Sequence, residues 1–410
     1  MTVADSNFDY VRLQEQSGQE VLLSIEDAAL LRELKFEVTA IYDKVERKEP
    51  ENAGLNSYFV NPKQYVGHFL LPSGTRVVIE PKIDAANVFR MLAYIYAREK
   101  QDVFLEAEVS YQPDKFLFEP LVDLFNALVA NRVRRGLFQD YVTYEENLSV
   151  FRGRLIPARH LQQNLARPDR IFCRFSPNTH DVEDNQIIKW TLWFLLRVFP
   201  WSPATLQRLR ANLHQFEAVT LKQPDRLSLK QRHYHRLNED YRFLHELCRL
   251  FLDRGSISET AGRVRFRGFL LDMNELFESF ITAAFEVVGR ASPLLVVSQA
   301  TAYLSLYPLR IRPDITIRKG GTTASVVDAK YKRSPQMYEN HDFYQMLAYA
   351  TALNCNQTFL IFPSAEYERD GPVAIVNSPV TIDVRRVNIA DKDCVHDAER
   401  VARNVLSSLR

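Results

Sequence analysis

Two stretches decide the fold of the C-terminal part of this chain: Arg312-Pro313-Asp314-Ile315, and Val326-Val327-Asp328-Ala329-Lys330-Tyr331-Lys332. The alternation after Asp314 and the β-branched run before Asp328 are typical of strands, and Gly320-Gly321 between them is typical of a hairpin turn. Pairing of these strands would bring the two carboxylates side by side. Because neighbouring carboxylates repel each other unless a cation lies between them, the pair predicts a divalent-metal site. Mg²⁺ suits it, since this ion binds one or two carboxylates together with water and phosphate.

Lys330 lies two residues after Asp328, so both side chains should point to the same face of the strand. A lysine in this place can orient or deprotonate an attacking water, and it can offset the charge of a phosphorane. The alternative is an ordinary solvated salt bridge, because an Asp-x-Lys triplet on a hairpin contributes little by itself.

Two predicted helices flank the hairpin in the sequence. Residues 271–285 show apolar positions at helical spacing, with Glu278 beside them and Glu275 one turn earlier as an alternative third carboxylate. Downstream, Gln345 and Tyr349 are separated by four residues, so they should share one helix face.

These residues and their order resemble the PD-(D/E)xK nuclease superfamily over about residues 265–390, with Gln345 and Tyr349 matching the QxxxY helix of its RecB-like branch. Within that superfamily the chain resembles the McrC family, the nuclease subunits of modification-dependent McrBC restriction systems. The similarity extends to the N-terminal and middle parts of the chain. It is carried there by Tyr65–Gly74, Ile79–Ile83, Val88–Tyr94, Phe151–Leu155 and Asp184–Lys189.

The resemblance implies a Mg²⁺-dependent DNA endonuclease, in which Mn²⁺ can substitute for Mg²⁺. Asp314 and Asp328 would ligate the metal, Glu278 would complete the metal site or bind a second ion, and Lys330 would activate the water. Gln345 and Tyr349 would steady the site and contact DNA.

The resemblance also implies a partner, a hexameric AAA+ GTPase of McrB type that carries the modified-base recognition domain. The chain has no G-x-x-x-x-G-K-[ST] loop, so another subunit would have to supply any nucleotide-driven motor. The charged segment 44–52 is a candidate for stimulating this partner, although for any single residue a solvated surface loop is the favoured interpretation. The expected substrate is double-stranded DNA that carries modified bases.

Basic residues near the hairpin are candidates for DNA contacts. Arg263, Arg265 and Arg267 alternate just before the predicted helix, so they would lie on one strand face, and Lys332 follows Lys330 at the same spacing. Phosphate contacts from such groups give affinity that is independent of sequence and sensitive to salt. The net charge of +1 decides nothing, because the distribution of charge matters more than its sum.

Composition is that of a large globular protein in a reducing compartment. The chain has 410 residues, of which 46% are hydrophobic, enough for two or three domains. Its four cysteines, Cys173, Cys248, Cys355 and Cys394, are scattered and form neither a disulfide framework nor a zinc motif. No export signal or membrane-spanning stretch is visible, so we expect a cytoplasmic protein without membrane contact.

The predicted fold class is α+β and multidomain. Residues 1–100 should form a β-rich module that binds the NTPase partner, and residues 101–255 should be mostly helical. Residues 256–410 should form an α/β PD-(D/E)xK restriction-endonuclease-like domain that ends in a helix over 395–409.

Two other functions stay open at this point. A free-standing RecB-like repair or resolving nuclease would use the same residues without a motor. An interaction protein that mainly activates a motor would have weak or no nuclease activity.

Overall fold

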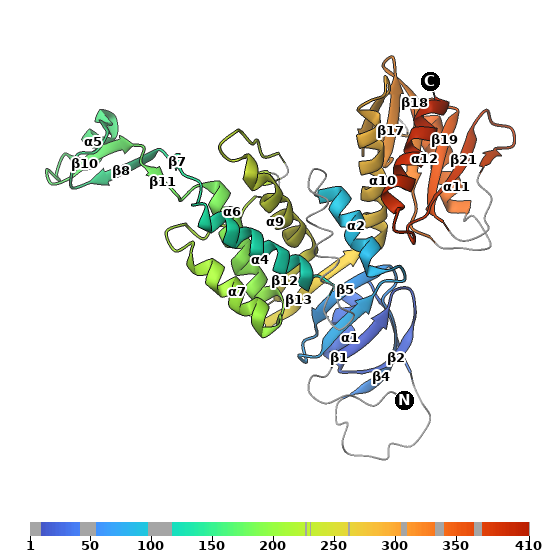
Figure 1. Ribbon diagram of the computed structural model, residues 1–410, viewed down its shortest axis with the longest axis horizontal. Coiled ribbons are helices and arrows are strands. Elements are labelled where there is room, and N and C mark those ends of the chain that lie inside the picture. Colours follow the sequence, from blue (N-terminus) through green and yellow to red (C-terminus); the bar gives the residue numbers. More distant parts are fainter. Residues whose placement is uncertain are drawn as a thin grey trace. The chain divides into compact units, whose positions relative to one another are not determined.

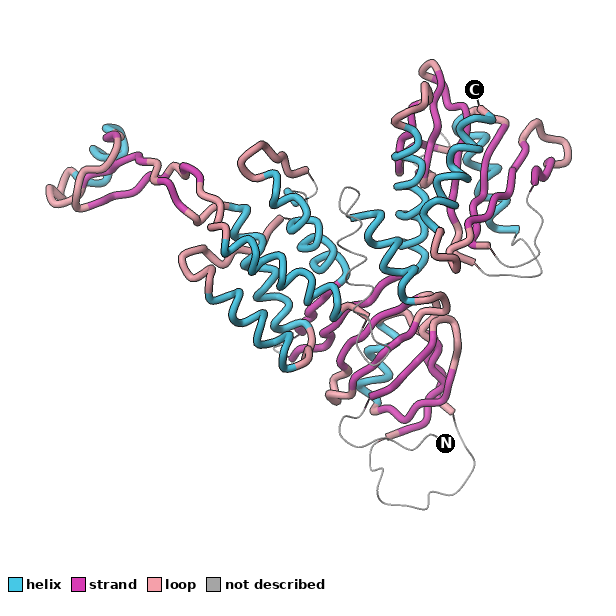
Figure 2. The backbone as a smooth tube through the Cα atoms, viewed as in Figure 1, coloured by secondary structure: helices cyan, strands magenta, loops and turns pink. Residues whose placement is uncertain are grey.

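The structure is a computed structural model. It describes residues 10–41, 55–96, 117–225, 228–229, 231–260, 263–304, 310–332, 340–364 and 371–409, with the backbone alone described for 256–260 and 263–266. Contacts divide the chain into two compact units, of which one joins Met1–Pro120 to Ile257–Arg410 and the other is Leu121–Ser256. Several sheets and helices share the chain (Figures 1 and 2), which confirms the predicted mixed α+β class. The division into three domains stays a prediction.

The N-terminal part of the first unit contains two sheets around one apolar core. One sheet has the order β1-β6-β5-β13-β12, with members β1 (Tyr10–Gln14), β6 (Arg76–Glu80), β5 (Tyr65–Leu70), β13 (Arg263–Asp272) and β12 (Gly255–Thr260). The other has the order β2-β4-β3, with members β2 (Gln19–Leu23), β4 (Asn56–Asn61) and β3 (Glu37–Ala40). Helix α1 (Ile25–Glu33) begins at Ser24, whose hydroxyl accepts from the Asp27 amide at 3.1 Å. The core is made by Leu13, Val60, Phe69, Val77 and Ile79, among others.

Strand β13 pairs with β5 although about 200 residues separate them, with Leu270 opposite Gly67. Gly67 has φ +143°, and a Cβ added there would lie 2.2 Å from the Phe269 carbonyl oxygen. Glycine is therefore needed where these two strands approach each other.

The C-terminal part is a six-stranded mixed sheet with the order β14-β17-β18-β19-β21-β20. Its members are β14 (Leu295–Ser298), β17 (Ile315–Lys319), β18 (Thr322–Ala329), β19 (Gln357–Pro363), β21 (Thr381–Val387) and β20 (Gly371–Ala374). Strands β17 and β18 are antiparallel, and Gly320 and Gly321 between them have φ +58° and +86°. The predicted hairpin is thus confirmed. A short ribbon, β15 (Ala302–Tyr303) with β16 (Arg310–Ile311), lies beyond β14 in the sequence.

Helices cover both faces of this sheet (Figure 1). Helix α11 (Asn340–Leu353) packs against the face that carries Val326 and Leu360, where Met346 and Tyr349 complete an apolar cluster. Strand side chains alternate, so the neighbours of Val326 and Leu360 in these strands face the opposite side of the sheet. On that side α10 (Met273–Gly289) contacts β18 and α12 (Cys394–Ser408) contacts β21. The C-terminal helix expected at 395–409 is confirmed.

The two parts of the first unit are joined by packed helices and by hydrogen bonds. Helix α2 (Ala85–Tyr96) contacts both α10 and α12, and the Tyr94 hydroxyl donates to Glu399 Oε1 at 2.9 Å. Gln64 Nε2 donates at 3.3 Å to Asp272, whose carboxylate caps α10 through the Asn274 amide at 2.9 Å. The helix that carries Glu278 is therefore anchored at its start by the N-terminal module.

The second unit is a group of helices with a β-rich extension. Its helices are α4 (Glu119–Arg134), which begins just before the unit, α6 (Glu183–Val198), α7 (Pro203–His214) and α9 (Arg242–Arg254). The extension contains β7 (Asp140–Tyr141), β8 (Tyr144–Leu148), β9 (Arg154–Leu155), α5 (Pro157–Asn164), β10 (Ile171–Phe175) and β11 (Asn178–Thr179), which the helical pattern of this region did not predict. Buried Asp184 of α6 ties the segment that precedes α9 to this helix, because it accepts from Arg232 at 2.6 Å and from Asn238 at 3.2 Å. Across the described residues, none of the helices is long and apolar enough to cross a membrane.

Candidate metal-dependent active site

The carboxylates of Asp314 and Asp328 meet at one end of the β17–β18 hairpin. Ile315 of β17 pairs with Val327 of β18. Asp314, which precedes Ile315, therefore lies beside Asp328, which follows Val327. Asp314 Oδ2 accepts from the Ala329 amide at 2.8 Å, and the Asp314 carbonyl accepts from the Gln299 amide at 2.8 Å. The side-chain bond therefore holds Asp314 against the end of β18, and the backbone bond continues the pairing of β14 with β17.

Lys330 completes this group. Its Nζ lies 2.6 Å from Asp328 Oδ2, as expected for side chains two residues apart on one strand, and its amide donates to the Ile361 carbonyl at 2.8 Å. The Asp328 side chain is 1% exposed and that of Lys330 is 18% exposed. This pair is therefore buried, and the surface salt bridge considered from the sequence does not describe it.

The electrostatics of the site show strong coupling among its charges. Burial, and then repulsion by Asp328, raise the pKa of Asp314 to about 8. Burial raises the pKa of Glu278 to about 6 against the opposing attraction of Lys330, and repulsion by Asp328 adds a smaller contribution in the same direction as burial. Burial alone would lower the pKa of Lys330, but attraction to Asp328, Asp314 and Glu278 raises it overall. Lys330 therefore stays protonated at neutral pH. Asp314 and Glu278 lose their protons only at a higher pH than usual, because their pKa values are raised.

Glu278 of α10, rather than Glu275, belongs to this group. Glu278 is half-buried, and its charge affects the pKa values of both Asp314 and Lys330. Glu275 is exposed and acts instead on Tyr65, Asp272 and Glu278. Of the two glutamates, Glu278 is therefore the one that interacts with Asp314 and Lys330, and its role as a third carboxylate stays a prediction.

The donor atoms fit Mg²⁺. Asp328 Oδ1 is buried and has no hydrogen-bond partner among the described residues, although buried acceptors are nearly always satisfied. In the same part of the chain, no three His, Cys, Asp or Glu side chains are grouped closely enough to hold a metal ion. The observed set is a pair of carboxylates, and Mg²⁺ commonly uses one or two carboxylates with water and substrate phosphate.

Helix α11 brings Gln345 and Tyr349 to the site, as their spacing predicted. Gln345 Nε2 donates to the Tyr349 hydroxyl at 2.6 Å, and that hydroxyl lies 3.5 Å from the Arg312 carbonyl oxygen. Burial, and then the charge of Asp328, raise the pKa of Tyr349. The two side chains therefore support the segment that leads into Asp314.

The basic residues predicted to contact DNA are less completely described. Lys332 Nζ lies 3.1 Å from the buried Asp342 carboxylate, and the lysine side chain is 35% exposed. Arg267 lies in β13 opposite Leu70 and is half-buried. Arg263 and Arg265 belong to the same strand, but their side chains lie outside the described residues, as does the whole segment 44–52.

Two residues beside the site received no role from the sequence, namely Tyr331 and Glu15. The Tyr331 hydroxyl donates to Glu15 Oε2 at 3.3 Å, and both side chains are buried. Tyr331 carried a local signal, because it follows Lys330 and must face the other side of the strand. Glu15 carried none, since Gln14-Glu15-Gln16 is a polar stretch typical of a surface turn.

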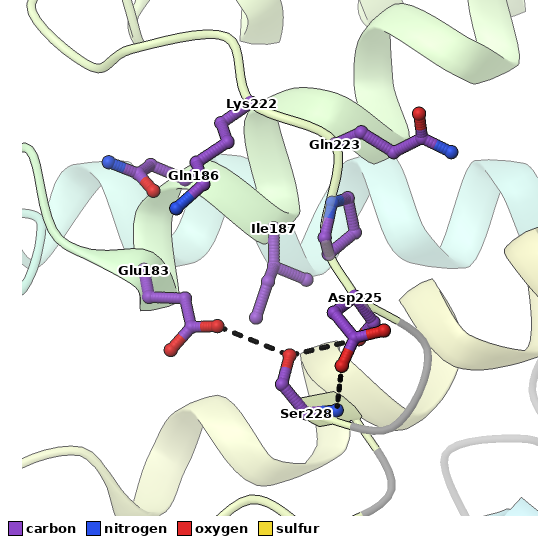
Figure 3. Close-up of a pocket in the computed structure, with 8 residues that line it drawn as sticks. Glu183, Gln186, Ile187, Lys222, Gln223, Asp225 and Ser228 are labelled. Carbon is purple, nitrogen blue, oxygen red and sulfur yellow. Dashed lines mark hydrogen bonds between the residues drawn. The ribbon is translucent and has the colours of Figure 1, made fainter.

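A separate hollow of about 150 Å³ lies in the second unit between α6 and the segment around residues 222–228. Figure 3 shows the Ser228 hydroxyl between Glu183 and Asp225; its oxygen lies 3.2 Å from Glu183 Oε1 and 2.9 Å from the Asp225 carbonyl oxygen, either of which can accept its one proton. Lys222 and Gln186 also line this hollow. None of these residues was a predicted site residue.

Fold and site together define an α+β protein with a buried two-carboxylate and lysine centre on a hairpin of a mixed sheet. A family model described as McrBC 5-methylcytosine restriction system component matches residues 60–363, which is most of the chain. The protein therefore belongs to this family, and the resemblance to McrC predicted from the sequence is confirmed.

Two solved structures from Thermococcus gammatolerans are similar to the chain. One is a refined half-complex from a tetradecameric assembly of McrB AAA+ hexamers with bound McrC, with 19% identity, coverage of 97% of this chain and 100% of that chain, and a TM-score of 0.59. The other is a cryo-EM structure of the McrBC complex, with 18% identity, coverage of 68% and 88%, and a TM-score of 0.45. The first shows a shared fold. A comparison with curated proteins gave no match.

Proposed function

We propose that this chain is the Mg²⁺-dependent DNA endonuclease subunit of a modification-dependent restriction system, and that its C-terminal part is a PD-(D/E)xK nuclease domain. The observation that carries the proposal is the buried arrangement of Asp314, Asp328 and Lys330, with Lys330 Nζ 2.6 Å from Asp328. Family membership supports it, because the family is that of a restriction-system component. Cytoplasmic localisation, where DNA would be accessible, follows from the same proposal.

Asp314 and Asp328 would hold Mg²⁺, which supplies a water of lowered pKa and neutralises charge on the scissile phosphate. Lys330, whose pKa is raised, stays charged and stabilises negative charge that develops on the phosphorus oxygens. It is therefore poorly suited to deprotonate water. Glu278, with a pKa of about 6, is better suited to accept that proton near neutral pH.

The partner in this proposal is a hexameric AAA+ protein of McrB type, with which the chain would assemble to cut double-stranded DNA. The Thermococcus gammatolerans structure of similar fold contains McrB AAA+ hexamers with bound McrC. Arg263, Arg265, Arg267 and Lys332 would contact DNA phosphates, while recognition of the modified base would belong to the partner. Phosphate contacts of this kind position DNA without reading its sequence.

The proposal is tested with Asp328→Asn and a matched control, Asp383→Asn. Asp383 is also a buried aspartate of the same sheet, and it also pairs with a cation two residues later, Arg385, at 2.7 Å. In the complex with the AAA+ partner and nucleotide, we expect Asp328→Asn to lower cleavage at least about a thousandfold, because it removes a metal ligand. Asp383→Asn should cut within about threefold of wild type, as expected for a change away from the reacting groups. Cleavage by Asp328→Asn at the wild-type rate would refute the proposed site.

A further inference from the structure

Tyr331 connects the candidate active site to the N-terminal module. It follows Lys330 directly, just beyond the end of β18, and its side chain packs against α10. The Tyr331 side chain is 4% exposed, and its ring centroid lies 6.0 Å from that of Phe277 in α10. Lys330 and Tyr331 are adjacent in the chain, so a contact that fixes the Tyr331 side chain also restrains the Lys330 backbone.

Glu15 is the acceptor for this phenol, and it is itself firmly held. It follows β1, and its amide donates to the Glu80 carbonyl at 2.9 Å, which continues the pairing of β1 with β6. Glu15 Oε2 accepts from the Lys82 amide at 3.0 Å and from the Tyr331 hydroxyl at 3.3 Å. Burying a carboxyl group costs free energy unless hydrogen bonds compensate. The hydrogen bonds of fully buried Glu15 are therefore specific contacts, and the residue does more than occupy space in the core.

We propose that Glu15 and Tyr331 are positioning residues, through which the N-terminal module fixes the end of β18 and holds Lys330 against Asp328. The Lys330 amide is fixed on one side by the Ile361 carbonyl at 2.8 Å, and the Tyr331 hydroxyl supplies the second point of attachment. A backbone held at both points keeps the lysine ammonium in place for the phosphate. This inference rests on the proposed nuclease function, and it adds residues from outside the nuclease part of the chain.

The structure supplies a matched control in Tyr94. Its hydroxyl also joins the two parts of the first unit, donating to Glu399 Oε1 at 2.9 Å, and its side chain is 2% exposed. It lies on α2 and its hydroxyl bonds α12, so this hydrogen bond does not reach the end of β18, which Lys330 follows. Tyr331→Phe and Tyr94→Phe therefore remove the same atom from tyrosine–glutamate hydrogen bonds that join the two parts of the unit, and only one of these bonds involves the neighbour of Lys330.

The test is single-turnover plasmid cleavage by the full-length chain with its AAA+ partner and nucleotide. A misplaced lysine lowers the rate constant, whereas a partly unfolded protein lowers the amplitude. We expect Tyr331→Phe to lower the rate constant about tenfold with unchanged amplitude, because small misplacements of reacting groups have large effects on rate. Tyr94→Phe should stay within about twofold, since its contact does not reach the reacting groups.

Hydrogen exchange of the free chain gives a second readout that requires no cleavage. Amides of residues 326–332 should exchange at least about fivefold faster in Tyr331→Phe than in wild type or Tyr94→Phe, because local opening there becomes easier. If wild type fails to cut DNA but this difference is found, the positioning role holds and the proposed function has failed. If wild type cuts and Tyr331→Phe equals it in rate and exchange, the inference is overturned. Equal losses of rate in both tyrosine variants would also overturn it.

Discussion

Asp314→Asn should stabilise the metal-free protein at alkaline pH while abolishing cleavage. The pKa of Asp314 is raised from 3.8 to about 8, so the folded protein binds this proton more tightly than the unfolded chain does. The folded state is therefore favoured at low pH and loses stability as pH rises from about 4 to about 8. A shift of this size corresponds to an upper limit of about 6 kcal/mol, at 1.36 kcal/mol for each pKa unit. Because the protein can relax around the buried charge of Asp314, we expect a gain of about 2 kcal/mol.

The assay is thermal unfolding of wild type and Asp314→Asn in EDTA at pH 5 and pH 8.5. The asparagine oxygen can still accept from the Ala329 amide, which in the native protein bonds Asp314 Oδ2 at 2.8 Å, so the main change is the loss of charge. We expect the variant to melt about 4 °C higher at pH 8.5, with a smaller difference at pH 5. Mg²⁺ should raise the melting temperature of wild type more than that of the variant. A variant that is equally or less stable than wild type at pH 8.5 in EDTA would refute the described coupling of the two carboxylates.

The remaining predictions concern the residues that surround the carboxylate pair. Glu278→Gln should lower single-turnover cleavage about a hundredfold, within the range of general acid–base catalysis, whereas Glu275→Gln should stay within about twofold; the reverse order would show that Glu275 is the functional carboxylate. For wild type, cleavage should fall as pH drops and Glu278 becomes protonated, and a rate that is constant from pH 5 to pH 7 would exclude Glu278 as a base. Lys330→Met should lower the cleavage rate at least about a hundredfold, because it removes the cation 2.6 Å from Asp328 that stabilises charge in the transition state. DNA binding measured in Ca²⁺ should change less than threefold in this variant, and a parallel loss of binding and cleavage would contradict a role in the transition state.

The centre of the site could be predicted because its signals are local. Gly320-Gly321 and the flanking alternation specify a hairpin, which brings Asp314 beside Asp328 without any knowledge of the remaining fold. The four-residue spacing of Gln345 and Tyr349 likewise specifies a shared helix face, and their side chains lie 2.6 Å apart.

Features that depend on distant pairing could not be read from the sequence. The strand 263–272 has an ordinary alternating pattern, and nothing in it specifies that it pairs with β5. This pairing places the N-terminal module and the C-terminal sheet in one compact unit, with 121–256 as another. The contact of Glu15 with Tyr331 depends on the same long-range arrangement. Local patterns predicted strands and helices, whereas their partners are chosen by packing over the whole unit.

Cleavage of methylated and unmethylated plasmid by the wild-type chain is the most direct test of the proposed role. The chain is assayed in Mg²⁺ alone, and then with a McrB-type AAA+ partner and GTP or ATP. The account predicts cutting of methylated plasmid with partner and nucleotide, and little cutting by the chain alone. Equal cutting of both plasmids by the isolated chain would contradict it and favour a free-standing nuclease. No cutting under any condition, with stimulation of nucleotide hydrolysis by the partner, would contradict the nuclease assignment itself.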